Sequence, residues 1–190
     1  MAIAKPKNAQ ELAKLASLKP PATDYLPQAQ NAQHYADLLV QNGQWMSALN
    51  YMAHAIPARE GVWWAWYCAR KAHAKDQDPA VVHALGLAEK WIASPNEENR
   101  QIAQSYADRQ EVSGAPHHVL EAIGATGELE DPATGEKIKP IPYFSCRFVY
   151  AATVASSYSP DPAAPQTTAG EYLRQAFEVA NRIQLWSQYQ

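Results

Sequence analysis

The segment 54–70 concentrates side chains that could do chemistry, and it reads HAIPAREGVWWAWYCAR. The proline at its fourth position is typical of a helix start, so we predict that one helix ends and another begins here. On the second helix Arg59 and Trp63 are four residues apart, as are Trp66 and Arg70. This spacing puts a guanidinium and an indole on one helix face and predicts two cation–π contacts.

Glu60 is the acidic member of this segment. It falls in the first helical turn, where the helix dipole favours a carboxylate, and it could accept a hydrogen bond from His54 or Arg70. The charged and aromatic side chains could dock a partner or ligand, or they could be a buried tryptophan cluster with satisfied polar atoms. The size of the indoles favours the buried interpretation. The candidate structural or partner-docking cluster comprises His54, Arg59, Glu60, Trp63, Trp64, Tyr67 and Arg70.

Other residue patterns that support catalysis or metal binding are missing from the sequence. The histidines include no pair at i, i+4 spacing, and Cys68 and Cys146 are too far apart to form a zinc-binding pair of the CxxC kind. There is no G-x-S-x-G nucleophile elbow and no phosphate-binding glycine loop. Cys68 stands among apolar residues, which raise the pKa of a thiol. We therefore predict no catalytic, cofactor-binding or metal-binding residues.

The composition favours a helical protein. Hydrophobic residues make up 47% of the 190 residues. Alanine, the best helix former, supplies much of that fraction, whereas the β-branched residues that favour sheets are sparse. We predict one all-α domain over residues 1–190, in which residues 1–27 could form a loosely packed N-terminal extension.

Charge and hydropathy limit the classes of partner. The net charge is −3 and no basic stripe is present, so we expect no nucleic-acid binding. No apolar run approaches the roughly 20 residues of a membrane-spanning helix, so we expect no membrane insertion. The first 18 residues lack the apolar core of a secretory signal. Two cysteines are too few for a disulfide framework, which favours reduced thiols and a cytoplasmic location.

Helix boundaries are marked by capping patterns. Asn8, Ser94 and Thr168 are each followed three residues later by glutamate, as in a capping box. A proline after Asp78 and another after Ser94 fit the first helical position. With the apolar periodicity, these signals predict helices at about 8–18, 29–41, 44–56, 58–74, 79–93, 95–110, 116–124, 143–157 and 168–187.

The remaining pattern concerns how these helices are arranged. The stretch 144–155 is apolar nearly all round, so we predict that it forms the central and most buried helix. Residues 124–142 read as a long loop that could hold a small hairpin between Leu129 and Ile138. We predict an irregular bundle of about 8–9 helices. Helices over 44–110 recur every 16 to 18 residues, so a short α-solenoid of helical hairpins is the alternative.

The run from His54 to Arg70 resembles the signature of a bacterial all-helical domain family of unknown function. That signature joins a His-Ala-x-Pro stretch to Arg-Glu-x-Val-Trp-Trp-Ala and then to Cys-Ala-Arg. The resemblance extends over about residues 30–190, through the proline-rich segment 139–142 and the apolar helix after it. It implies a helical fold, carries no assigned activity, and implies an association with type VI secretion loci.

These observations lead to one functional hypothesis and two rivals. We expect a non-enzymatic cytoplasmic interaction or adaptor protein with a protein partner, in the setting of a type VI secretion system. The first rival is a small-molecule-binding domain or enzyme that uses His54, Glu60 and Arg70. The second is an immunity protein that binds a toxic effector.

Overall fold

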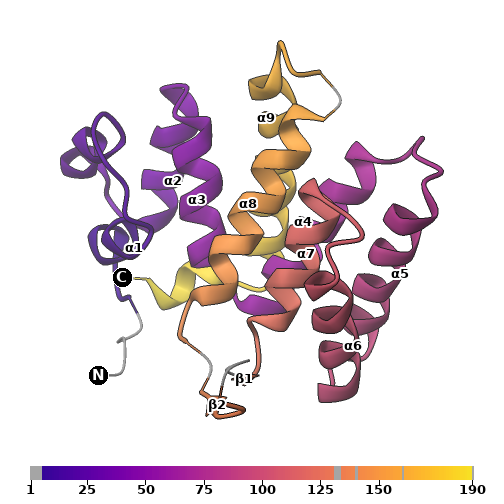
Figure 1. Cartoon of the computed structure of the whole chain (residues 1–190). Coiled ribbons are helices and arrows are strands. Elements are labelled where there is room, and N and C mark those ends of the chain that lie inside the picture. Colours follow the sequence, from indigo (N-terminus) through magenta and orange to yellow (C-terminus); the bar gives the residue numbers. More distant parts are fainter. Residues whose placement is uncertain (1–5, 131–133, 140, 160, 190) are drawn as a thin grey trace.

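The computed structural model describes residues 6–130, 134–139, 141–159 and 161–189. Within these ranges the chain forms nine α-helices, two short 3₁₀ helices and one two-stranded hairpin (Figure 1). The α-helices are α1 (Ala9–Leu15), α2 (Ala32–Gln41), α3 (Trp45–Ala55), α4 (Ala58–Ala72), α5 (Pro79–Ala93), α6 (Glu97–Asp108), α7 (Gly114–Gly124), α8 (Phe144–Tyr158) and α9 (Pro165–Arg182). The 3₁₀ helices are η1 (Ala22–Gln28) and η2 (Leu185–Gln188), and the strands are β1 (Leu129–Glu130) and β2 (Lys137–Ile138). The predicted all-α class is confirmed.

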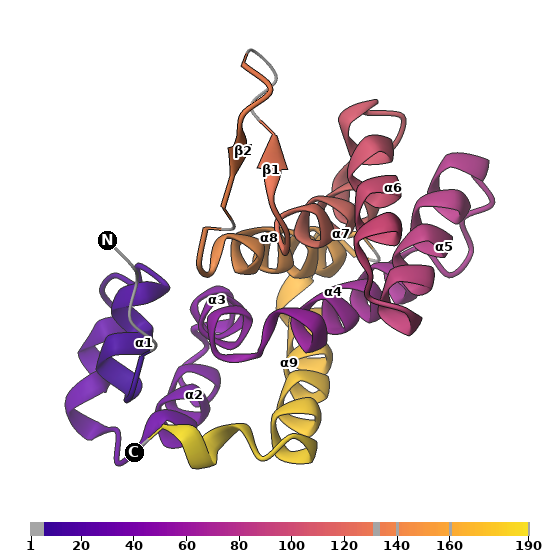
Figure 2. The ribbon, with the colours of Figure 1, turned by 90° about the horizontal axis from the view of Figure 1, so that it is seen from below.

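Helix α8 lies at the centre of the bundle. It packs against α3, α4, α7 and α9, with α1–α3 on one side of it and α4–α7 on the other (Figure 2). Because α8 packs against both α3 and α7, the helices form a closed, irregular bundle and not the open array of a solenoid. The predicted central position is confirmed, but α8 is not buried all round. Arg147 is exposed, and Phe148 and Tyr150 are half-buried.

The buried face of α8 is built largely from small polar residues. Ser156 donates to the carbonyl of Ala152 and Ser157 to that of Thr153, at 2.7 and 2.8 Å. These hydroxyls are satisfied within their own helix, so they can be buried without a partner on the facing helices. Small side chains at these positions let neighbouring helices approach α8 closely.

Two of the three predicted capping boxes are wrong. The Asn8 side chain does accept from the amide of Glu11 at 2.9 Å and caps α1. Helix α6, however, is capped by Asn96 and not by Ser94, because Asn96 accepts from the Asn99 amide at 2.9 Å. Helix α9 already begins at Pro165, ahead of the predicted cap at Thr168.

The last predicted helix is also shorter than expected. Helix α9 ends at Arg182, and Gln184 adopts a left-handed conformation with φ of 53°. The short helix η2 then carries the chain back to α3, where the hydroxyl of Tyr189 donates to the carbonyl of Ala55 at 3.0 Å. The C-terminal tail is thus held against the end of α3.

The N-terminal segment packs more closely than a loose extension would. Leu12 is fully buried in the core, and so is Ala22 of η1. The hydroxyl of Tyr35 donates to the carbonyl of Ala22 at 3.0 Å and ties η1 to α2. Over the described part of 1–27, apolar side chains therefore join the core.

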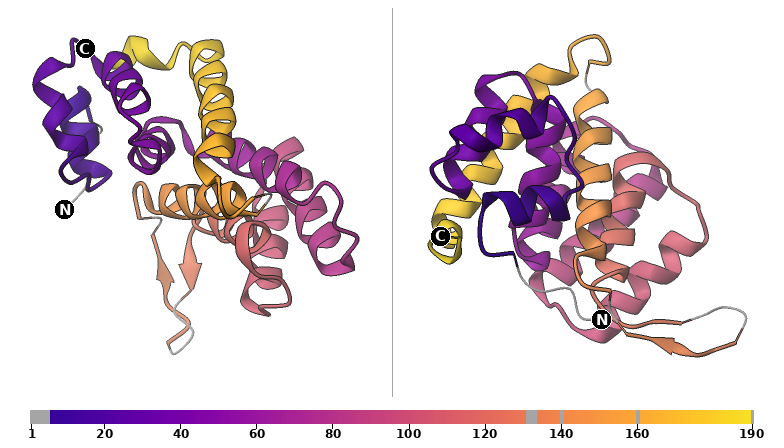
Figure 3. Two further views of the ribbon diagram at one scale, coloured as in Figure 1. Left: turned by 90° about the horizontal axis from the view of Figure 1, so that it is seen from above. Right: turned by 90° about the vertical axis from the view of Figure 1, so that its left-hand side faces the viewer.

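The predicted hairpin is confirmed. Strands β1 and β2 pair antiparallel, with Leu129 opposite Ile138, and the hairpin projects from the bundle (Figure 3). Residues 131–133, which belong to the connection between the two strands, lie outside the described residues. None of the helices in the described ranges combines the length and the apolar character that a membrane-spanning helix needs.

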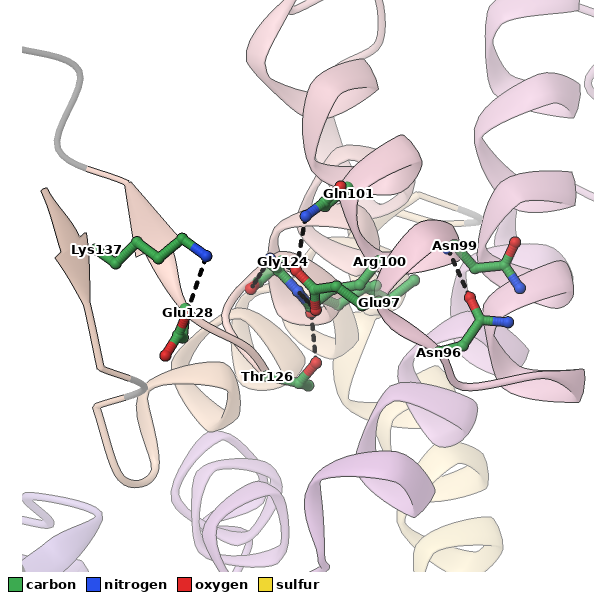
Figure 4. A network of polar contacts seen from close by, with 10 residues as sticks. Asn96, Glu97, Asn99, Arg100, Gln101, Gly124, Thr126, Glu128 and Lys137 are labelled. Atoms are coloured by element: carbon green, nitrogen blue, oxygen red, sulfur yellow. Dashed lines mark hydrogen bonds and ion pairs between the residues drawn. The ribbon is translucent and has the colours of Figure 1, made fainter. Parts of the chain in front are cut away.

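A buried arginine joins α6 to α7 next to this hairpin (Figure 4). Arg100 is 7% exposed, pairs with both oxygens of Glu97 at 2.6 and 2.8 Å, and donates to the carbonyl of Gly124 at 2.8 Å. A side chain on Gly127 would collide with the Arg100 guanidinium, so the glycine makes room for it. The burial of Arg100 could not be predicted from the sequence, because its partners come from both helices.

Candidate functional site

The signature segment spans the end of α3 and most of α4. Helix α3 ends at Ala55, and Ile56 is extended. Pro57 then precedes the first helical residue of α4, as a proline at a helix start should. The predicted junction is therefore confirmed. Its side chains divide among three surroundings: the face toward α5, the core, and a half-exposed face of α4.

Two of the segment's side chains bind the backbone of α5. The Arg59 guanidinium donates to the carbonyl of Ile92 at 3.1 Å. The Trp66 indole N–H donates to the carbonyl of Leu85, also at 3.1 Å. These carbonyls lie in the middle and in the last turn of α5, so the contacts hold that helix against α4.

One of the two predicted cation–π contacts is present. The Arg70 guanidinium lies 5.0 Å from the centroid of the Trp66 ring, as the spacing predicts. Arg59 turns instead to the carbonyl of α5, so its predicted contact with Trp63 is wrong. The ionic partner of Arg70 is Glu89 of α5, at 3.7 Å.

The predicted partnership of Glu60 is also wrong. Arg70 pairs with Glu89, and the Nδ1 atom of His54 faces the carbonyl of Asn50 at 2.9 Å. Within the described part of the chain, the Glu60 carboxylate has no hydrogen bond or ion pair, and it is half-buried. The reason is geometric: Arg70 is ten positions along the helix from Glu60, and its side chain folds over Trp66 toward α5.

Trp64 is the core member of the segment. Its side chain is fully buried, and its indole N–H donates to the carbonyl of Tyr172 on α9 at 2.9 Å. The Tyr172 hydroxyl donates in return to the carbonyl of Cys68 at 3.2 Å. Cys68 is fully buried as well, and burial raises the pKa of its thiol well above the ordinary value.

Trp63, Tyr67 and Lys71 form a half-exposed row on α4, which we call the aromatic ladder. The rings of Trp63 and Tyr67 stack at 5.7 Å with an interplanar angle of 21°. The Lys71 ammonium lies 5.8 Å from the Tyr67 ring centroid. Both rings are half-buried and Lys71 is exposed. Because the three residues are four positions apart, they follow one face of the helix.

A pocket of about 250 Å³ lies where the signature segment meets α8 and the C-terminal tail. From the signature it is lined by the five residues of the α3–α4 junction, His54, Ala55, Ile56, Pro57 and Ala58. The start of α8 and the tail complete it with Tyr143, Ser145, Cys146, Gln188 and Tyr189. Of the predicted cluster, His54 therefore lines this pocket, whereas Glu60 and Arg70 do not.

His54 is the titratable group in this pocket that is best suited to bind a ligand. Its side chain is 7% exposed, and Nδ1 is held by the Asn50 carbonyl. A carbonyl can only accept, so Nδ1 carries the proton and Nε2 is left as an acceptor when the ring is neutral. Burial lowers the pKa of His54, and the charge of Arg147 lowers it further, which favours the neutral ring.

The sequence did not reveal the other half of the pocket. Tyr143, Ser145 and Cys146 follow the signature by more than seventy positions, and Tyr189 is almost at the end of the chain. Their positions depend on the packing of α8 against α3 and on the return of the tail. The one available signal was the family resemblance, which continues into the apolar helix.

The remaining histidines form no metal centre with any other ligand that the structure describes. His117 and His118 both contact Glu121, at 3.5 and 2.8 Å, on the outer part of α7. Across the described residues, no group of three or more histidine, cysteine or acidic side chains is arranged to hold a metal ion.

Comparison with known protein families matches residues 35–180 to a family of unknown function, DUF6931. The matched range includes all of the signature segment, the aromatic ladder and the part of the pocket that α8 contributes. Searches of curated proteins and of solved structures find no match. The match covers more than half of the chain, so the protein belongs to the DUF6931 family of unknown function.

Proposed function

We propose that this chain is a non-enzymatic interaction protein that binds a protein partner through the aromatic ladder. The observation that carries the proposal is the stacked, half-exposed pair Trp63 and Tyr67, which ends at the exposed Lys71. The setting we propose is the bacterial cytoplasm, with the protein as an accessory component of a type VI secretion system.

The chemistry of the ladder suits a protein interface. Tryptophan and tyrosine are enriched among the residues that dominate binding energy, because they bury a large area at a small entropic cost. Here the stack fixes both rings before binding, so little side-chain freedom remains to be lost. The ammonium of Lys71 next to them favours an acidic group on the partner.

The rest of the segment supports the ladder as a rigid platform. Arg59 and Trp66 fasten α5 on one side of α4, and Trp64 fastens α9 on another. On a further face of α4 the rings of Trp63 and Tyr67 stay half-exposed. A rigid helix face held from both sides is a suitable site for specific binding.

The protonation state of two cysteines, Cys68 in the signature and Cys146 in the pocket, favours a binding function over nucleophilic catalysis. A cysteine attacks as the thiolate. Burial raises the pKa of Cys146 to about 11, and it raises the pKa of Cys68 well above the ordinary value. Both side chains are therefore protonated near neutral pH.

Affinity capture from the native host tests this proposal. We expect the wild-type protein to retain one partner in stoichiometric amount, and Tyr67→Ser to lose it while the protein remains folded. Retention of the partner by Tyr67→Ser would contradict docking at the ladder. A partner that proves to be a toxin neutralised by this chain would establish the immunity function in place of the adaptor function.

A second candidate function is small-molecule binding at the His54 pocket. The observation that favours it is the buried imidazole, which lines a pocket formed by the signature segment itself. Glu60 and Arg70 have no part in this version of the hypothesis because they lie away from the pocket. A metabolite that remains bound through purification from the native host, and that His54→Gln no longer retains, would support it.

A further inference from the structure

We infer that the partner of the aromatic ladder is a second copy of this chain, bound about a two-fold axis with the two α4 helices antiparallel. The inference rests on the proposed function, because it takes the ladder as a docking surface and names its occupant. It is based on two opposite charges that lack ionic partners and on their nearly equal spacing from the stacked rings.

Glu60 extends the face of α4 that carries the ladder. With roughly 3.6 residues per turn, Glu60 and the three ladder residues lie within an arc of about 80° of the helix surface. The face begins with the carboxylate of Glu60, continues with the stacked rings of Trp63 and Tyr67, and ends with the ammonium of Lys71. It is therefore aromatic at its centre and oppositely charged at its two ends.

Both charges at the ends of this face lack an ionic partner. The Glu60 carboxylate is half-buried and has no hydrogen bond or ion pair within the described part of the chain. Lys71 lies over the Tyr67 ring and pairs with no carboxylate of the described residues. The two cannot pair with each other, because eleven positions of helix separate them by about 16 Å. Since a half-buried carboxylate without a cation is unfavourable, a cation from outside the chain would stabilise this face.

The four residues are arranged almost symmetrically about the level of Ala65. Trp63 precedes Ala65 by two positions and Tyr67 follows it by two, while Glu60 precedes it by five and Lys71 follows it by six. In a two-fold interface, if one residue contacts a second residue of the other copy, that second residue also contacts the first. With the axis at the level of Ala65, Glu60 of each copy meets Lys71 of the other, and Trp63 meets Tyr67.

A second copy supplies the complementary surface by symmetry alone. An unlike partner would have to present a cation, an apolar centre and an anion in the matching order. Two-fold dimers are also by far the commonest soluble oligomers. The interface places four aromatic rings at its centre and two Glu–Lys pairs toward its rim, which is the usual distribution of residue types in protein interfaces.

The size of the ladder predicts a reversible dimer. A tryptophan or tyrosine side chain can bury about 150–250 Å², and these rings are already half-buried in the single chain. Four such rings supply well under the roughly 1,200 Å² of a stable interface, so the neighbouring surfaces must add to it. The population of the dimer should therefore depend on the protein concentration.

Sedimentation velocity of the purified protein tests the inference without any other protein. We expect a monomer–dimer equilibrium over about a hundredfold range of concentration. Glu60→Lys and Lys71→Glu should each raise the dissociation constant at least about tenfold, because each places like charges opposite one another in both symmetric contacts. Lys75→Glu makes the same charge change at an exposed lysine beyond the end of α4, and it should dimerise as the wild type does.

A mixture of the two charge variants gives the most specific result. In an equimolar mixture, the two positive charges of Glu60→Lys face the two negative charges of Lys71→Glu. The mixture should therefore dimerise with an affinity close to that of the wild type, although each variant alone dimerises poorly. Recovery of the dimer in the mixture also shows that both variants are folded.

A wild-type protein that stays monomeric, single variants that dimerise as the wild type does, or a mixture that stays monomeric would each overturn the inference. Affinity capture then decides the proposed function separately. We expect the protein that is captured in the native host to be the untagged chain itself. A monomeric chain that captures a different protein, released by Tyr67→Ser, would overturn the second copy and keep the ladder as the docking surface. Retention of the captured protein by Tyr67→Ser would overturn docking at the ladder itself.

Discussion

Trp64 donates a hydrogen bond to Tyr172, and Tyr172 returns one to Cys68, so two hydrogen bonds run in opposite directions between α4 and α9. The indole N–H of Trp64 donates to the Tyr172 carbonyl at 2.9 Å, and the Tyr172 hydroxyl donates to the Cys68 carbonyl at 3.2 Å. All three residues are buried. Each ring thus packs in the core and also donates a hydrogen bond to a buried carbonyl. A polar group buried without such a bond would lower the stability of the fold.

The first prediction concerns this pair. Trp64→Ala should lower the free energy of unfolding by about 3–5 kcal/mol, because it leaves a large cavity and an unpaired carbonyl. Tyr172→Phe should cost roughly 0.5–1.5 kcal/mol, since it removes a single hydrogen bond. Glu60→Ala, which removes a carboxylate without a described partner, should stay within about 0.5 kcal/mol of wild type. Urea unfolding of the three variants measures this; a larger loss for Glu60→Ala than for Trp64→Ala would contradict the assignment.

The sequence predicts contacts between neighbouring residues well, but it does not predict contacts between different helices. Local rules identified the helices, the junction before Pro57 and the Arg70–Trp66 contact, because each depends on residues close in the chain. They failed for Glu60 and Arg59, since the partner of Arg59 lies on α5 and nothing local indicated it. They failed equally for the pocket, whose second wall comes from α8 and the tail. The cap of α6 at Asn96 and the start of α9 at Pro165 show the same limit: several residues could start each helix, and packing selected one.

The second prediction concerns the cysteines. Native protein at neutral pH should react slowly with thiol reagents at both positions, because burial raises the pKa of each thiol. Cys146 lines the pocket whereas Cys68 is fully enclosed, so Cys146 should react first. Mass spectrometry of timed alkylation reactions, with the urea-unfolded protein as the fast reference, distinguishes the two sites. Rapid labelling of Cys68 in the folded protein would be inconsistent with its burial.

The third prediction concerns acid stability. The Arg100 guanidinium holds the pKa of Glu97 at about 2, so the carboxylate stabilises the fold above the pKa of the unfolded state. That contribution is lost as the pH falls from the ordinary glutamate range toward 2. Glu97→Gln should therefore be less stable than wild type at pH 7, and the difference should shrink in acid. Glu98→Gln, an exposed neighbour, serves as the control; a Glu97 difference independent of pH would show that its charge is not the cause.

The fourth prediction concerns the protonation of His54. Because burial lowers its pKa in the folded state, protonation at mildly acidic pH favours unfolding. Its stabilising contribution is present above the pKa of the unfolded imidazole and is lost as the pH falls through the folded value. Long-range ¹H–¹⁵N NMR at pH 7 should show the neutral form with the proton on Nδ1. A charged ring at pH 7, or a proton on Nε2, would refute the proposed orientation.

The central claim is that the aromatic ladder binds the partner, and reversal of one charge tests it most directly. Lys71 ends the ladder, whereas Lys75 is an exposed lysine four positions further along, beyond the end of α4. The dissociation constant of the purified partner should rise at least about tenfold for Lys71→Glu, because an attractive contact becomes a repulsive one. Lys75→Glu should bind as wild type does, and both variants should keep the wild-type melting temperature. Equal affinity of Lys71→Glu and wild type would contradict the account.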